Sequence, residues 1–227
     1  MAPEKPSDKP IDKPPNKPSE IPGKIDFRKL EQARAWADEA NVKRPWREEF
    51  FHLFARELLS IGAEELSVIE LGSGPGFLAQ EVLKALPHVD YTALDFSKAM
   101  HSLARERLGR LSGGVRFVDA NFKNPDWNVG LPTFDAVISM QSVHEVRHKK
   151  RVPALYAAVR KLLHKHGVFL VCDHYAGEGG MADTELYMTV AEQGEALRNA
   201  GFSEVTLLLE KGGFAMWRAR NESGNPQ

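Results

Sequence analysis

The stretch Glu70-Leu71-Gly72-Ser73-Gly74-Pro75-Gly76 decides the fold of this 227-residue chain. It follows a short apolar strand that begins at Leu66, and it leads into a helix with one apolar side. Glycines let the backbone approach a ligand where any Cβ atom would clash. The free N–H groups and the positive dipole end of the following helix point at the same place. The stretch therefore predicts a ligand-binding turn at the edge of a parallel sheet.

The spacing of the glycines separates the ligands that such a turn can bind. Counted from Gly72 and Gly74, the third glycine of the dinucleotide pattern G-x-G-x-x-G falls at position 77, where Phe77 stands. A P-loop needs Gly-Lys-Ser or Gly-Lys-Thr, and the chain contains neither. Glu70 at the strand end repels a pyrophosphate but attracts an ammonium group. The spacing thus disfavours an NAD-dependent oxidoreductase, an alternative that measured NAD binding would restore.

Strands and helices alternate along the rest of the chain. The remaining strands are expected at 91–95, 115–118, 134–140, 168–173, 204–209 and 213–219. Helices are expected at 27–40, 46–61, after the N-cap Ser97, over 152–163 and at 185–200. This order predicts an α/β fold, a Rossmann-like doubly wound sheet of seven mostly parallel strands. Lys211-Gly212-Gly213 predicts a closing antiparallel hairpin at the C-terminal edge.

Composition divides the chain and narrows its class. Residues 1–24 hold half of the 14 prolines, and Lys-Pro recurs there every four residues from 5–6 to 17–18, which predicts a disordered tail. Residues 25–63 predict a helical lid, 64–220 the ligand-binding domain, and 221–227 a disordered C-terminal tail. A formal charge of −1 argues against a nucleic-acid partner, although it leaves room for a local basic patch. The oligomeric state stays open.

Localisation is inferred from two features of the sequence. No apolar run has the length of a membrane span or of a signal segment. A lone cysteine, Cys172, excludes an internal disulfide and a cysteine zinc cluster, and it suits a reducing compartment. These features predict a cytoplasmic protein without a membrane partner.

Two further acids end the next two predicted strands. Asp95 closes Tyr91-Thr92-Ala93-Leu94-Asp95, 19 residues after Gly76, and Asp119 follows the strand at 115–118. The two oxygens of a carboxylate suit a pair of neighbouring hydroxyl groups. With Glu70, three acids thus end three successive strands. In this pattern, over about residues 64–219, the chain resembles the class I S-adenosylmethionine-dependent methyltransferases.

The resemblance implies a cofactor, S-adenosylmethionine, and a role for each matching residue. Glu70 would serve the amino group of its methionine moiety, and Gly72, Gly74 and Gly76 would line the pocket. Asp95 would accept from both ribose hydroxyls and Asp119 from the adenine amino group. Further binding candidates are Ser73, Phe96, Met100, Ala120, Asn121, Phe122 and Met140, of which Phe96, Met100 and Phe122 fit core packing equally well.

The chemistry needs alignment of the acceptor more than it needs a catalytic group. A general base helps only if the acceptor must lose a proton. His144, in the loop after the strand at 134–140, is the candidate base. A histidine that merely holds this loop by hydrogen bonds fits the same position. His174 and Tyr175, after the next strand, can meet substrate or cap that strand.

Two segments are expected to choose the acceptor. Residues 27–61 resemble the N-terminal helices that cover the pocket in small-molecule members of the family. There Trp36, Trp46 and Arg47 would supply aromatic surface and a charge partner, or pack. Residues 175–190, with three glycines, predict a gate or a simple turn.

Missing motifs narrow the reaction. No Asn/Asp-Pro-Pro-aromatic motif follows the strand at 134–140, and Met140, instead of an aspartate, ends it. These departures disfavour nucleobase amino-methylating enzymes and the metal-dependent catechol type, so no metal is expected. The sequence therefore predicts methyl transfer to an O, N or S atom of a small molecule. A non-catalytic cofactor-binding protein that supports a partner is the alternative, and protein acceptors stay open.

Overall fold

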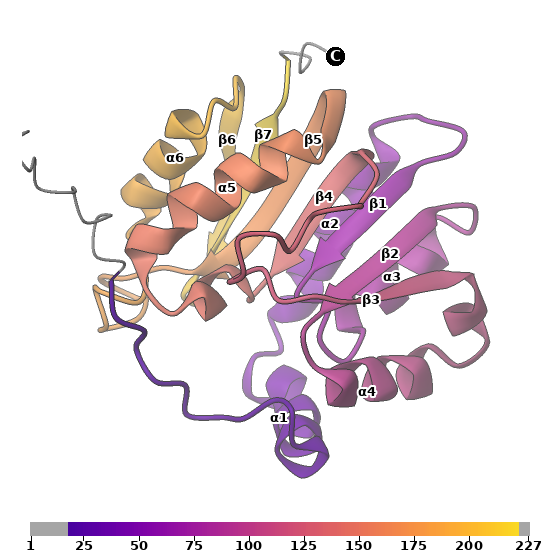
Figure 1. The fold of residues 1–227 in the computed structure, drawn as a ribbon, viewed down its shortest axis with the longest axis horizontal. Helices are drawn as coiled ribbons and strands as arrows, with labels where there is room; N and C mark the ends of the chain where they lie inside the picture. The colour runs from indigo at the N-terminus through magenta and orange to yellow at the C-terminus, as the bar shows by residue number, and fades with distance from the viewer. Residues whose placement is uncertain (1–17, 223–227) are drawn as a thin grey trace, which may run out of the picture.

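A seven-stranded sheet forms the centre of the computed structural model, which describes residues 18–222 (Figure 1). The strand order β3-β2-β1-β4-β5-β7-β6 confirms the predicted doubly wound sheet, and β7 runs antiparallel to both of its neighbours. The strands are β1 (Ser67–Leu71), β2 (Asp90–Asp95), β3 (Val115–Asp119), β4 (Phe134–Met140), β5 (Leu163–His174), β6 (Val205–Lys211) and β7 (Phe214–Arg220).

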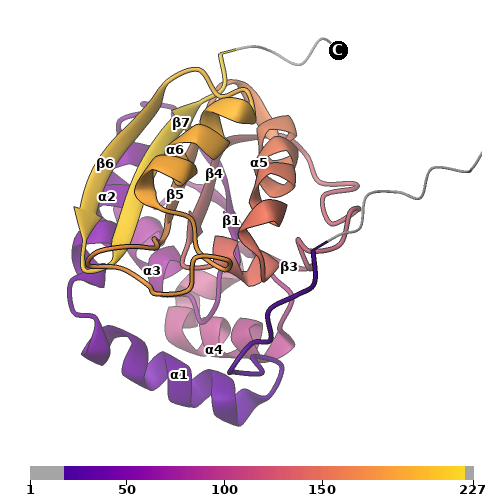
Figure 2. The same ribbon diagram turned by 90° about the vertical axis from the view of Figure 1, so that its left-hand side faces the viewer.

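Helices cover both faces of the sheet because its central strands are apolar on both sides. Figure 2 shows α5 and α6 together on one face, and α2 and α3 pack on the opposite one. The helices are α1 (Leu30–Lys43), α2 (Arg47–Leu59), α3 (Phe77–Ala85), α4 (Lys98–Leu108), α5 (Val152–Lys161) and α6 (Val190–Asn199). Three short 3-10 helices are η1 (Gly109–Gly114), η2 (Val143–Val146) and η3 (Lys149–Arg151).

Two predicted helix boundaries were wrong. The helix expected at 185–200 begins only at Val190, because Thr189 and Glu192 form a reciprocal capping box at that point. The helix expected at 27–40 lies at 30–43, and Phe27 remains outside it with its ring packed edge-on against Trp36 at 5.6 Å. Residues 185–189 and Phe27 therefore lie in loops at one end of the sheet.

Residues 18–24, predicted to belong to a disordered tail, include residues that contact the folded part of the chain. Ile21 and Arg147 exchange two hydrogen bonds, from Ile21 N to Arg147 O at 3.0 Å and from Arg147 Nε to Ile21 O at 2.8 Å. Glu20 pairs with Lys123 at 2.9 Å and with Arg151 at 2.7 Å. We call residues 18–26 the strap. Composition missed it because the contacts of Glu20 and Ile21 are with residues over a hundred positions away. Residues 1–17 and 223–227 of the predicted tails lie outside the described residues.

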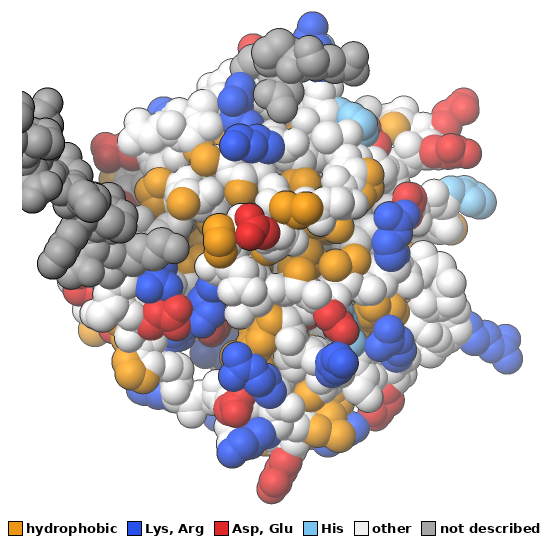
Figure 3. Space-filling view, in the orientation of Figure 1, with side chains coloured by type: hydrophobic (Ala, Val, Ile, Leu, Met, Phe, Trp, Pro, Cys, Tyr) orange, Lys and Arg blue, Asp and Glu red, His pale blue; other side chains and the backbone are white. Residues whose placement is uncertain are grey.

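The surface carries mixed charge. On the face shown in Figure 3, basic and acidic side chains are interspersed, in keeping with the net charge of −1. Within residues 18–222, no helix has the length and apolar character needed to span a membrane.

Candidate active site

A cavity of about 400 Å³ lies at the carboxyl ends of β1, β2, β4 and β5. The strand order reverses between β1 and β4, which is where ligands bind in open α/β sheets. The strap, α1, α2, the glycine stretch at 70–76 and the loops after β4 and β5 all contribute to its wall. Segments far apart in the sequence thus meet at one site.

The glycine stretch is built for close approach at Gly72. Its φ of +66° lies in the left-handed region, and a Cβ atom there would sit 2.3 Å from Cβ of Ser142. Gly72 and Gly74 line the cavity. Gly76 does not. Its missing Cβ lets the start of α3 pack closely against α4, because a Cβ atom there would lie 3.2 Å from the Cα atom of Ala104.

Glu70 is a buried carboxylate in the cavity wall. Its side chain is 2% exposed and accepts a hydrogen bond from the Tyr91 hydroxyl at 2.7 Å. Burial raises the pKa of Glu70 to about 8, and the bond from Tyr91 opposes this only in part. A positive group that enters the cavity would favour the ionised carboxylate.

Asp95 is held at the end of β2 by two backbone donors. Ser97 N donates to its Oδ1 atom at 2.8 Å and Gly74 N to its Oδ2 atom at 2.9 Å. Each oxygen keeps a lone pair for a further donor, and the side chain lines the cavity. Phe96, Phe122 and other predicted binding residues line it too, namely Ser73, Met100 and Met140.

Three more predicted residues, besides Gly76, lie outside this cavity. The Asp119 side chain is 57% exposed and lies 3.3 Å from His101 Nε2, and neither Asp119 nor Ala120 lines this cavity or the smaller one beside it. Asn121 lines a neighbouring cavity of about 260 Å³ between Phe122 and the strap. The contact of Asp119 with adenine stays a prediction.

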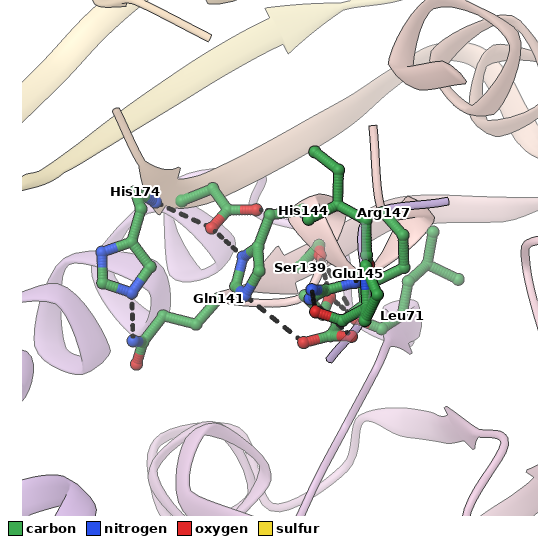
Figure 4. A network of polar contacts seen from close by, with 11 residues as sticks. Leu71, Ser139, Gln141, His144, Glu145, Arg147 and His174 are labelled. Atoms are coloured by element: carbon green, nitrogen blue, oxygen red, sulfur yellow. Dashed lines mark hydrogen bonds and ion pairs between the residues drawn. The ribbon is translucent and has the colours of Figure 1, made fainter. Parts of the chain in front are cut away.

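His144 lies in the cavity wall and is bound twice by Asp173 (Figure 4). Its Nδ1 atom donates to Asp173 Oδ1 at 2.7 Å, and its backbone N donates to Asp173 Oδ2 at 2.8 Å. Burial acts to lower the pKa of His144, but the charge of Asp173 and its hydrogen bond outweigh burial and raise that pKa above 6.5. The pair joins the loop after β4 to the end of β5.

Other polar side chains surround this pair. Gln141 Nε2 donates to His174 Nε2 at 3.2 Å, and burial lowers the pKa of His174 to about 4. The Tyr187 ring lies 5.3 Å from the ring of His144, on the loop predicted to be a gate. Sequence reasoning missed Asp173, Gln141 and Tyr187. The polar pair Asp173-His174 at the end of an apolar strand was the available signal, because that end shares the edge of Asp95.

Residues 18–222 contain no group of three or more His, Cys, Asp or Glu side chains arranged to hold a metal ion. The polar groups of the cavity instead suit an organic ligand with an ammonium group, hydroxyl groups and an aromatic ring. Glu70, Asp95 and the pair Phe96 and Phe122 offer one partner for each of these features.

Comparison with known proteins agrees with this geometry. Residues 68–167 match the sequence model of the methyltransferase domain family. The chain is 23% identical over 219 residues to carboxy-S-adenosyl-L-methionine synthase of Nautilia profundicola. The match covers 83% of this chain and 92% of the relative. Two further curated relatives, at 33% and 34% identity, are matched over only 33% and 44% of their length.

Solved structures share the fold. An O-methyltransferase family protein from Burkholderia thailandensis superposes with a TM-score of 0.71 at 17% identity, over 88% of this chain and 62% of that one. Human N-acetylserotonin methyltransferase in complex with its cofactor gives 0.63 at 16% identity, over 87% and 58%. The chain therefore spans less than two thirds of both structures.

Residues 68–167 thus carry a methyltransferase domain, and the fold around it is that of the class I S-adenosylmethionine-dependent methyltransferases. Its cofactor is S-adenosylmethionine, and the cavity residues fit that molecule.

Proposed function

We propose that the chain transfers a methyl group from S-adenosylmethionine to an O, N or S atom of a small molecule, with His144 as the base. The position of His144 in the wall of the cavity, with its hydrogen bond to the buried Asp173, carries this proposal. The cofactor supplies a methyl group on a sulfonium, which is already activated for in-line displacement.

The cofactor would be held by residues from three strand ends. Glu70 would face the ammonium group and Asp95 would accept from the ribose hydroxyls, because both side chains line the cavity. Phe96 and Phe122 would enclose the adenine ring of the cofactor, next to the strap. Gly72 keeps the wall open where a side chain would collide with Ser142.

His144 has the form of a general base. Because its Nδ1 atom donates to Asp173, the neutral ring carries its lone pair on Nε2. Asp173 acts through His144 and is a positioning residue, since its two bonds fix both the ring and the backbone. An acceptor O–H, N–H or S–H group could deliver its proton to Nε2 as the new bond forms.

The enclosure of the site favours a small acceptor. The strap and the loop after β5, through Met181, Leu186 and Tyr187, form part of the cavity wall. A volume of about 400 Å³ falls in the range of small-molecule sites and has to hold both cofactor and acceptor.

A search for the product tests this proposal. The protein is incubated with a metabolite extract and with cofactor that carries an isotopic label in its methyl group. We expect mass spectrometry to find a labelled metabolite heavier than its precursor by one CH2 group. Cofactor binding without any labelled metabolite would contradict the proposal and support the non-catalytic alternative.

A further inference from the structure

Arg47 is a buried cation in the cavity wall. It is the first residue of α2 and is only 4% exposed. Its Nη1 atom donates to Asn41 Oδ1 at 2.5 Å, whereas its Nε atom is buried without any hydrogen-bond partner. Within residues 18–222, no carboxylate forms an ion pair with it. A guanidinium group has five donors, so most of its binding capacity is unused.

Aromatic rings hold this guanidinium in place. Its central carbon lies 5.0 Å from the ring centre of Phe77, 5.2 Å from that of Phe51 and 5.8 Å from that of Trp36. These contacts position a cation but do not neutralise it. Burial lowers the pKa of Arg47 to about 10, and nearby Arg44 adds to the effect. A buried charge of this kind is costly unless a counter-ion joins it.

Arg47 and Glu70 share one wall of the cavity. Both line it, and each acts electrostatically on the charged form of the other, although they form no ion pair. An α-amino acid carries an ammonium group and a carboxylate on the same carbon atom. A wall with one buried carboxylate and one buried guanidinium is complementary to that head group.

We propose that Arg47 binds the carboxylate of the methionine moiety of S-adenosylmethionine while Glu70 faces its ammonium group. This inference rests on the proposed role of Glu70. It makes the first turn of α2 part of the cofactor site, so that the N-terminal helices would do more than cover the acceptor. Arg47 and the glycine stretch would then both contact the methionine moiety of the cofactor.

Two ligands that differ by one carboxylate test the inference. Binding of S-adenosylmethionine and of its decarboxylated form, which keeps the amino group, is measured by calorimetry with the full chain. Wild-type protein should bind S-adenosylmethionine at least about tenfold more tightly, the scale of a hydrogen bond between charged groups. Arg47→Gln should bring this ratio close to one, and Arg47→Lys should restore part of it. Arg56→Gln, an exposed arginine on the same helix, is the matched control and should keep the wild-type ratio.

The ratio separates binding from folding, because a damaged cavity weakens both ligands alike. An Arg47→Gln protein that keeps the wild-type ratio would overturn the inference, whether Arg47 only packs or serves an acidic acceptor. The cofactor assignment would survive that result. Wild-type protein that binds neither ligand would overturn the cofactor assignment together with the inference.

Discussion

Asp173 sets the proton affinity of His144, so the pH dependence of the reaction should depend on it. The base must be neutral, and its pKa is raised above 6.5. We expect kcat/KM to rise with pH through an apparent pKa above 6.5. Asp173→Asn should move that pKa down and reduce kcat about 100-fold, because the ring loses its charged partner. The pH–rate profiles of both proteins check this.

His88→Gln is the control for that experiment, since His88 is exposed and far from the cavity lining. Its profile should match that of wild type. If the Asp173→Asn profile also overlaps with wild type, His144 is not positioned by Asp173 for catalysis.

Glu70 should make the cofactor-free protein less stable as pH rises. Its folded-state pKa is about 8 against an ordinary 4.5, so between these values the folded state keeps a proton that the unfolded state has lost. The free energy of unfolding should then fall by up to about 1.4 kcal/mol per pH unit from this group. Glu70→Gln removes this contribution to the slope. As pH rises from 5 to 8, the variant should therefore become more stable relative to the wild-type protein.

Urea unfolding of the two proteins at both pH values measures the effect. Below pH 4.5 the two should differ little in slope, because the carboxyl group is protonated in both states. A stability difference that is the same at pH 5 and pH 8 would show that Glu70 ionises normally.

Gly72 should tolerate no side chain. Gly72→Ala places a Cβ atom 2.3 Å from Ser142 Cβ at a φ of +66°. We expect this change to lower the free energy of unfolding by about 2 kcal/mol or more. Gly62 has a similar φ of +72° with no atom within 4 Å, so Gly62→Ala carries only the backbone cost of about 1 kcal/mol. Equal melting temperatures for the two variants would contradict the close approach.

Among the elements, the strap makes the clearest prediction. Deletion of residues 1–17 keeps the described contacts of the strap, and cofactor affinity should not change. Deletion of residues 1–26 removes one wall of both cavities and the partners of Arg147, and it should weaken cofactor binding about tenfold.

Calorimetry on the two truncated proteins compares them directly, with a melting curve to show that each is folded. Identical affinities would mean that the strap only rests on the surface. The same contacts tie the strap to Arg147, three residues after His144, so loss of turnover in the longer deletion should accompany the loss of affinity.

The order of helices and strands could be predicted from the sequence, whereas their boundaries and the contacts between distant side chains could not. Alternating apolar segments predicted the sheet correctly, and Gly72, Glu70 and Asp95 lie together in the wall of the cavity at its edge. The start of α6 depended on a capping box inside an otherwise helical pattern. The strap escaped notice because its partners Arg147 and Arg151 are distant in sequence, and proline content alone favoured a tail.

At the scale of the whole molecule, the site also combines positions that the sequence predicted with contacts that it did not. His144 lies in the cavity wall, where the loop after β4 had placed it, but its partner Asp173 comes from another strand. Asp119 ends β3 as expected, yet its side chain is exposed, because a strand position fixes the backbone and not the rotamer. Distance along the chain, and not composition, limits such predictions.

The central claim is that this fold both binds the cofactor and uses it, with His144 as the base. A comparison of wild type with His144→Gln measures this most directly, by cofactor affinity and by transfer of labelled methyl groups to metabolites in an extract. We predict similar affinities and a loss of transfer of about 100-fold in the variant. Equal transfer by both proteins would contradict the role of His144, and no transfer by cofactor-saturated wild type would contradict the enzyme itself.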